Sequence, residues 1–132
     1  MEVRDAIEAD AEALADLATG PPDVMRNLVH DRTVRVAEDD EEIVGFVSYD
    51  AERGTVHVTQ LAGEQSVCER LLAEPIEFAK REHMAVELLV PDDEPGVQTA
   101  VEASGFAETG SGPQFEGQPT TRYRLEPGRA EQ

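Results

Sequence analysis

Residues Leu61–Val90, LAGEQSVCERLLAEPIEFAKREHMAVELLV, decide the fold of this chain. They predict a strand that ends at Gly63, an amphipathic helix directly after it, and an apolar strand, Met84–Val90, after a short connection. At about 100° per residue, one half of the helical wheel collects the apolar side chains. These are Val67, Cys68, Leu71, Leu72, Pro75, Ile76, Phe78 and Ala79. Because the charged side chains occupy the other half, one face of the helix must pack on a sheet, and the stretch predicts a βαβ unit.

The composition is that of one acidic domain. The chain has 132 residues, enough for the core of one ordinary domain and too few for two. It carries 29 acidic against 11 basic residues, a formal net charge of -18. In dilute salt, repulsion among the carboxylates destabilises such a chain, whereas about 1 M salt screens their charges within roughly 3 Å. The sequence therefore indicates a halophilic protein. An acidic disordered segment is the alternative, and 39% hydrophobic residues in a periodic pattern disfavour it.

The same composition excludes several classes of function. An acidic surface repels phosphate backbones and the sequence has no basic patch, so we expect no nucleic-acid partner. Cys68 is the only cysteine, which excludes an intramolecular disulfide and a cysteine zinc cluster. No two histidines have metal-ligand spacing on one element, so we expect no metal. No apolar run has membrane length, so we expect no membrane partner and a cytoplasmic location.

The rest of the chain predicts shorter elements around the βαβ unit. Helical spacing predicts two early helices, Glu8–Thr19 and a short helix capped by Asp23, and period-two alternation then predicts a three-strand meander. The predicted strands are Met1–Arg4, Thr33–Ala37, Ile43–Tyr49, Thr55–Leu61, Met84–Val90, Phe106–Glu108 and Thr120–Leu125. A last helix is predicted over Gly96–Ser104, and a Gly-rich loop over Thr109–Gln118. The fold class is α/β (α+β), in the order β-α-α-β-β-β-α-β-α-β-β. We expect a single domain over residues 1–126 and a flexible C-terminal tail over residues 127–132.

This order of elements resembles the GNAT superfamily of N-acetyltransferases, of which the chain would be a divergent, halophilic-type member. The resemblance covers Met1–Leu125. Its most specific local feature is Glu102-Ala103-Ser104-Gly105-Phe106, which looks like the Gly-Phe turn after the family's last helix. Val3-Arg4-Asp5-Ala6 looks like the family's usual opening. The resemblance implies a mixed, mostly antiparallel central sheet with helices on both faces.

The resemblance also implies a binding site for acetyl-CoA as co-substrate. In the family, the strand equivalent to Thr55–Leu61 splays from the one equivalent to Met84–Val90, and the pantetheine lies in the gap. Backbone N–H groups at the start of the intervening helix hold the pyrophosphate, because a helix N-terminus offers unpaired donors and partial positive charge. The family's Gln/Arg-x-x-Gly-x-Gly/Ala loop falls on Gly63–Cys68. The implied cofactor-binding residues are Thr59, Leu61, Gly63, Glu64, Gln65, Ser66, Val67 and Cys68.

This loop departs from the family pattern at three places. Ser66 and Cys68 stand where glycine or alanine is usual. Glu64 would place a carboxylate near the bound phosphate, which is unfavourable unless the side chain points away. Cys68 could lie near the thioester, but it falls within the apolar arc of the helix, and a buried thiol usually behaves as a small hydrophobic residue.

His57 is the candidate catalytic residue. It shares one face of its predicted strand with Thr55, Thr59 and Leu61, where it could take the proton of an amine substrate directly or through water. The alternative is an ordinary half-exposed strand histidine, because a fold alone does not establish catalysis.

The family's usual catalytic acid has no counterpart. Family members often use a tyrosine four residues before the glycine of the Gly-Phe turn, and that position is Val101, which cannot donate a proton. Tyr49 and Tyr123 are the only tyrosines, and either could lie in the core or at the rim of the cleft.

Three functions are compatible with these observations. The first is an acyl-CoA-dependent N-acetyltransferase whose acceptor is an amine of a small molecule or a protein, attacking the thioester directly. The second is a catalytically silent protein of the same fold that binds a nucleotide-like ligand or a protein partner. The third is a dimerisation module, which would expose an apolar face on the closing strand. A homodimer is compatible with each of them.

The charge predicts a salt requirement. We expect the melting temperature to rise steeply with KCl concentration, because screening weakens repulsion among the carboxylates. Circular dichroism melts across a KCl series measure this, with a non-ionic osmolyte as the control for general solute effects. A melting temperature that ignores KCl would contradict the halophilic interpretation.

Overall fold

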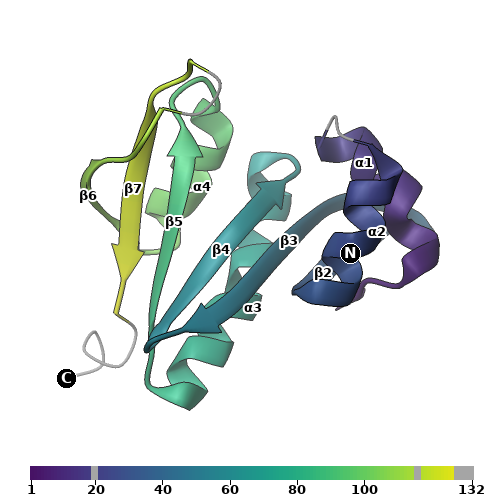
Figure 1. Cartoon of the computed structure of the whole chain (residues 1–132), viewed down its shortest axis with the longest axis horizontal. Coiled ribbons are helices and arrows are strands. Elements are labelled where there is room, and N and C mark those ends of the chain that lie inside the picture. The colour runs from purple at the N-terminus through teal and green to yellow at the C-terminus, as the bar shows by residue number, and fades with distance from the viewer. Residues whose placement is uncertain (19–20, 115–116, 127–132) are drawn as a thin grey trace.

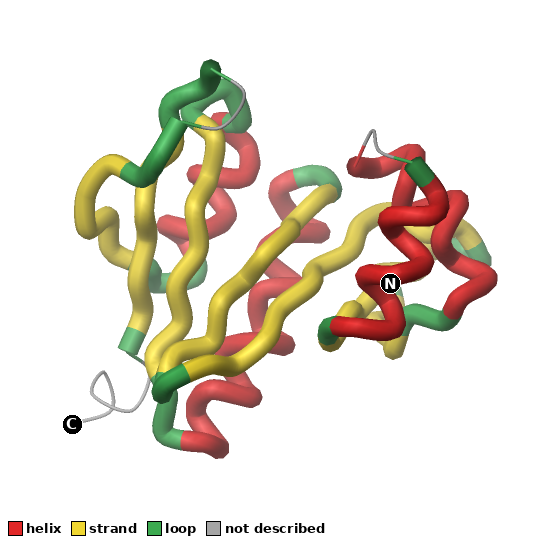
Figure 2. The backbone as a smooth tube through the Cα atoms, viewed as in Figure 1, coloured by secondary structure: helices red, strands yellow, loops and turns green. Residues whose placement is uncertain are grey.

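All the strands belong to one sheet in the computed structural model, which describes residues 1–18, 21–114 and 117–126. The sheet has seven strands in the order β1-β2-β3-β4-β5-β7-β6 (Figures 1 and 2). Every neighbouring pair is antiparallel except β4 and β5, which are parallel. The strands are β1 Glu2–Asp5, β2 Thr33–Asp39, β3 Glu42–Glu52, β4 Thr55–Ala62, β5 Ala85–Pro91, β6 Ala107–Ser111 and β7 Thr120–Leu125. The predicted mixed, mostly antiparallel sheet is confirmed.

The helices cover the two faces of the sheet unequally. They are the 3-10 turn η1 Glu8–Asp10 and the α-helices α1 Ala11–Ala18, α2 Pro22–Asp31, α3 Gln65–Glu82 and α4 Pro95–Ala103. Along β3, Phe46 packs with α1 and α2 in one core cluster, whereas its neighbour Val47 packs with α3 in the other. Because successive strand residues point to opposite faces, the two helix pairs lie on opposite sides. Figure 1 shows α1 and α2 beside the β2–β3 end, so the front of β4, β5 and β7 carries no helix.

The predicted βαβ unit is confirmed. Strand β4 leads into α3, and α3 leads into β5, which pairs with β4 in parallel. The buried residues of α3 are Val67, Cys68, Leu71, Leu72, Pro75 and Ala79. All six belong to the apolar arc of the helical wheel, and two further members of that arc, Ile76 and Phe78, are partly buried against the same core. None of the helices in the described ranges has the length and apolar composition that a membrane crossing needs.

The cap predicted for the second early helix was wrong, and the first early helix differs from its prediction in helix type. Asp23 does not cap α2, because the helix begins at Pro22 with Pro21 in the cap position and no side-chain cap. Proline suits the first helical position, where its missing N–H would have no helical partner. The predicted first helix is a 3-10 turn followed by α1, and its expected last residue, Thr19, lies outside the described residues.

The last hairpin also differs from the prediction. Strand β6 runs over Ala107–Ser111, so it takes in part of the expected Gly-rich loop. All five of its residues are exposed, and a register shift between Glu108 and Gly110 interrupts its pairing with β7. A fully exposed strand carries no apolar alternation, so backbone pairing with β7 defines it rather than a side-chain pattern. The predicted tail, residues 127–132, lies outside the described residues.

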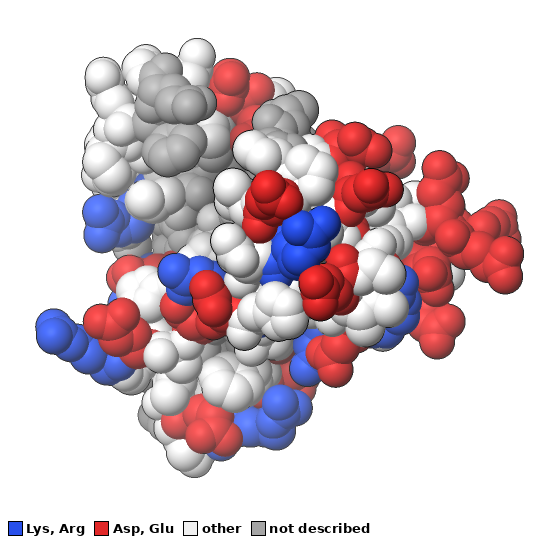
Figure 3. Space-filling model, turned by 45° about the vertical axis from the view of Figure 1, so that its right-hand side comes forward, with Lys and Arg blue, Asp and Glu red and all other residues white. Residues whose placement is uncertain are grey.

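The surface is acidic with basic side chains set among the acids. Figure 3 shows red acidic groups gathered over the right-hand part of the view and blue basic groups mostly beside red ones. Ion pairs of this kind include Arg26 with Asp23 at 2.9 Å and Arg35 with Asp5 at 2.6 Å. Exposed pairs contribute about 0–1 kcal/mol each, so apolar burial rather than surface charge stabilises this fold.

Two glycines let α3 approach the sheet closely. A Cβ added at Gly45 on β3 would lie 2.5 Å from Val67 Cγ1 and 2.6 Å from the Ala62 carbonyl oxygen. Gly63, at φ +136, would meet the same Val67 methyl at 3.0 Å. The first turn of α3 is therefore seated directly on β3 and on the turn that follows β4.

We predict that Gly45→Ala destabilises the protein by about 1 to 3 kcal/mol, because the new methyl group overpacks against backbone. Chemical denaturation in concentrated KCl measures the free energy of unfolding. Gly96→Ala is the matched control, since a Cβ at Gly96 meets nothing within 4 Å. Equal free energies of unfolding for the two variants would contradict the close packing of α3 on β3.

Candidate functional site

The parallel pairing of β4 and β5 covers only half of β4. It extends from Thr55 opposite Ala85 to Val58 opposite Leu88. Beyond Val58, Gln60, Leu61 and Ala62 pair with β3 alone. The two strands therefore separate toward the end of β4 that leads into α3.

A β-bulge marks the point of separation. On β3, Ser48 pairs with Gln60 and Tyr49 pairs with Val58, so Thr59 is the extra residue of β4. The Thr59 hydroxyl lies 2.6 Å from the Ser48 hydroxyl and 3.2 Å from the Ser48 carbonyl oxygen. A bulge bends its strand and increases the local twist, so it directs the end of β4 away from β5.

The bulge corrects one sequence prediction about the site. Leu61 was expected on the same face as His57, from strict alternation along the strand. In the structure Leu61 packs against the core cluster that contains Val58, on the side of α3. The extra residue reverses the alternation after Thr59, which a period-two pattern cannot reveal.

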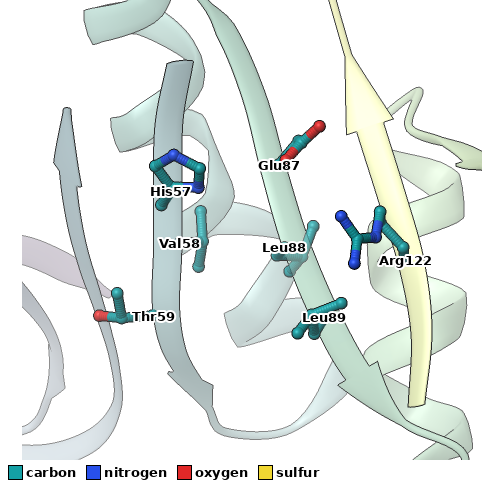
Figure 4. A pocket seen from close by; sticks show the side chains of 7 residues that line it. All are labelled: His57, Val58, Thr59, Glu87, Leu88, Leu89 and Arg122. Atoms are coloured by element: carbon teal, nitrogen blue, oxygen red, sulfur yellow. The ribbon is translucent and has the colours of Figure 1, made fainter. Parts of the chain in front are cut away.

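A hollow of about 350 Å³ lies over β4, β5 and β7, on the side of the sheet away from α3 and α4. His57, which is half-buried, lines it from β4 and Arg122 lines it from β7, with β5 between them (Figure 4). The other lining residues are Val58, Thr59, Glu87, Leu88 and Leu89. The carboxylate of Glu87 accepts a hydrogen bond from Arg124 at 2.7 Å. The structure thus places the predicted residues His57 and Thr59 in one hollow.

The N-terminus of α3 presents free backbone donors. Glu64 is in the cap position without a side-chain hydrogen bond, and the first helical bond runs from the Cys68 N–H to the Glu64 carbonyl oxygen at 2.9 Å. The N–H groups of Gln65, Ser66 and Val67 precede that bond, as at the start of any helix. Gln65 and Ser66 are exposed, so these donors lie at the surface.

Carboxylates stand next to these donors. A second hollow, of about 470 Å³, is lined by Asp39, Glu64 and Ser66 together with Met1, Val44 and Val67. The backbone of this region fits a phosphate group, and its two acidic side chains oppose one unless they are screened or turned away.

Val67 and Cys68 are buried and can offer a ligand only their backbone. The Cys68 thiol lies 3.4 Å from the Gly63 carbonyl oxygen, and burial raises its pKa to about 11. Because the thiolate is the reactive form, Cys68 is not suited to act as a nucleophile. Cys68 is therefore the buried, hydrophobic residue that its position in the apolar arc of the helix predicted.

Neither tyrosine replaces the missing catalytic acid. Val101 is fully buried, and Tyr49 and Tyr123 are both core residues. The Tyr123 hydroxyl donates to Glu102 at 3.2 Å, and burial raises the pKa of Tyr123. A buried phenol already bonded to a carboxylate is a poor proton donor for a ligand in the cleft.

One acidic residue near the start of α3 was missed by the sequence analysis. Glu94 is in the cap position of α4, and its charge contributes to the raised pKa of Cys68. Partial desolvation is the main cause that raises the pKa of Glu94, although the residue is exposed, and the charge of Asp93 is a further cause. Glu94 lies in an acidic connection, so its residue type did not distinguish it from its neighbours, although the Pro95 that follows is a typical start of a helix.

Within the described residues, no group of three or more His, Cys, Asp or Glu side chains is arranged to hold a metal ion.

Comparisons with known proteins identify the fold. No protein-family model and no curated protein matches the sequence. Among solved structures, ribosomal-protein-alanine N-acetyltransferase from Brucella melitensis is similar at 18% identity and a TM-score of 0.79, over 96% of this chain and 99% of that one. A Salmonella typhimurium protein assigned as an acetyltransferase, solved with its cofactor acetyl-CoA, is also similar at 18% identity and a TM-score of 0.79, over 96% and 94% of the chains.

A third similar structure is an acetyltransferase of the GNAT family from Bacillus cereus, at 16% identity and a TM-score of 0.74, over 95% of this chain and 96% of that one. Likeness at these identities establishes the fold. The chain has the GNAT fold over nearly its whole length, as the sequence analysis predicted.

Proposed function

We propose that this protein, with the GNAT fold as its scaffold, is an acyl-CoA-dependent N-acyltransferase that transfers an acetyl group to an amine. The observation that carries this proposal is the separation of β4 from β5 after Val58 and Leu88, at a bulge, directly before a helix with an open N-terminus. That combination supplies an extended slot with unpaired strand backbone on one side and phosphate-binding donors at its end.

The chain offers distinct groups to the two parts of acetyl-CoA. The N–H groups of Gln65, Ser66 and Val67 would hold the pyrophosphate, and Gly63 lets the backbone turn into the helix without a Cβ in the way. The backbone of Thr59–Leu61, which is not paired with β5, would face the pantetheine and the thioester. When bound, acetyl-CoA supplies an acyl group activated as a thioester.

The reaction is direct transfer. The amine nitrogen forms a bond to the thioester carbon, the C–S bond breaks, and the sulfur leaves as the CoA thiolate. A backbone N–H of the Thr59–Leu61 segment would polarise the carbonyl oxygen in the transition state. His57 would accept the proton that the amine loses, directly or through water. With Val101 at the usual acid position, the thiolate takes its proton from solvent, which is feasible because an ordinary thiol has a pKa of about 8.5.

The proposal extends to the acceptor, the domain organisation and the ionic environment of the protein. The acceptor is an amine of a small molecule or a protein, and residues 1–126 act as one domain, compatible with a homodimer. The net charge of -18 suits a salt-rich cytoplasm. A catalytically silent protein of this fold is the second candidate, favoured by Val101 and by the carboxylates beside the N-terminus of α3.

We predict that acetyl-CoA binds this protein and that Glu64→Gln strengthens the binding several-fold, because the substitution removes a carboxylate from the phosphate site. Calorimetric titration in KCl measures both dissociation constants. Glu82→Gln, the same charge change at the other end of α3, should leave the dissociation constant unchanged. No detectable binding up to millimolar acetyl-CoA would sink the acyltransferase proposal and favour the silent protein.

We predict that His57→Ala lowers kcat by about a hundredfold or more, the range of a lost general base, while the dissociation constant of acetyl-CoA stays the same. Release of free CoA thiol with a panel of amines measures the rate. His30→Ala is the control, since His30 is exposed on α2 and pairs with Glu8 at 3.4 Å, away from the hollow that contains His57. Unchanged turnover by the His57 variant would remove this residue from the mechanism.

A further inference from the structure

Among the described residues, Arg122 is the one strand arginine that has no carboxylate within 4.0 Å. The other three, Arg4, Arg35 and Arg124, lie 2.9, 2.6 and 2.7 Å from acidic partners. In a chain with 29 acidic residues, an arginine without an acidic partner on the sheet is unusual. Its positive charge is available to a ligand.

The charges around Arg122 leave it as the free cation of the hollow. Glu87 is the acidic residue that lines the same hollow, and its carboxylate is already bonded to Arg124 at 2.7 Å. Figure 4 shows the Arg122 side chain reaching from β7 toward β5. Leu89, which is 43% exposed, adds an apolar surface beside it. The hollow therefore combines one unpaired guanidinium with an apolar floor and the imidazole of His57.

Arg122 lies on the opposite side of the sheet from the proposed phosphate site. Its neighbour Tyr123 packs in the core cluster under α3 and α4, so Arg122 points to the other side of the sheet, which carries no helix over β4, β5 and β7. The donors at the start of α3 belong to the other face. An anion bound by Arg122 therefore belongs to the acceptor rather than to the pyrophosphate of acetyl-CoA.

The geometry points to an acceptor that carries a carboxylate as well as its amine, an amino-acid-type molecule, with Arg122 binding the carboxylate. This inference rests on the proposed acyltransferase function. The planar guanidinium matches a carboxylate with two parallel hydrogen bonds, which fixes the orientation of the bound molecule.

The strand register sets the size of this acceptor. His57 is opposite Glu87, and Arg122 is opposite Leu89, two residues further along β5. Two strand spacings of about 4.8 Å and this offset put the Cα atoms of His57 and Arg122 roughly 12 Å apart. Both side chains line the space between, so they would hold an amine and a carboxylate that are only a few bonds apart.

The test compares amines that differ only in the carboxylate, L-lysine with cadaverine and L-alanine with L-alaninamide, in concentrated KCl. Binding is measured without acetyl-CoA by saturation-transfer NMR, and turnover with acetyl-CoA is measured by thiol release. We expect the amino acid of each pair to be preferred about tenfold, and Arg122→Gln to remove this preference by raising KM with little change in kcat. Arg81→Gln, which removes an exposed arginine at the end of α3, should leave the preference intact.

The outcomes separate the inference from the proposed function. Equal binding and turnover within each pair, or no binding of either amino acid, would overturn the carboxylate site. Weaker acetyl-CoA binding by Arg122→Gln, with the preference unchanged, would overturn it too, by assigning Arg122 to the CoA. If acetyl-CoA does not bind but the amino acids bind through Arg122, the acyltransferase proposal fails and the carboxylate site stands.

Discussion

The packing of α3 on the sheet is the interaction on which the rest of this structure depends. Leu71 and Leu72 are fully buried in its apolar face, which contacts β2, β3, β4, β5 and α4. Burying one such leucine contributes about 1.5 to 3 kcal/mol, more than an exposed ion pair contributes. Because only two residues separate the end of β4 from the start of α3, the same packing also fixes where the N-terminal donors of α3 lie. Gly45 and Gly63 make this close approach possible.

The second constraint is the bulge at Thr59. At this bulge the pairing of β4 with β5 ends, while the hydrogen bonds of β4 to β3 continue. Strand β4 is therefore part of the continuous sheet on one side and forms the edge of a cleft on the other. The two faces of the sheet then take different roles. The face under α3 and α4 is core, whereas the other face is covered by α1 and α2 near β2 and β3 and is open where it carries His57 and Arg122. In the proposed reaction, acetyl-CoA and acceptor approach from different directions and meet where the strands separate.

The fold of this chain resembles known acetyltransferases more closely than its sequence does. The fold matches solved acetyltransferases over 96% of the chain at 18% identity, yet Val101 occupies the position of the usual acid, and Asp39 and Glu64 stand beside the helix N-terminus. Surface charge of this density suits concentrated salt, where screening shortens the reach of each carboxylate. A phosphate site with acidic neighbours is consistent with such an environment, because screened carboxylates repel a bound phosphate less.

The sequence by itself determined the order of elements, the buried face of α3 and the βαβ unit, because these follow from local periodicity and from the need to cover apolar surface. It also placed Cys68 in the core, since the residue lies within the apolar arc of α3. Only the tertiary structure decided the bulge, the face of Leu61, the extent of β6 and the meeting of His57 with Arg122. A bulge cannot be recognised from the composition of its strand. His57 and Arg122 are 65 positions apart in the chain and line the same hollow only because of the strand order. The fold was therefore readable from local pattern, whereas the candidate site depended on long-range pairing.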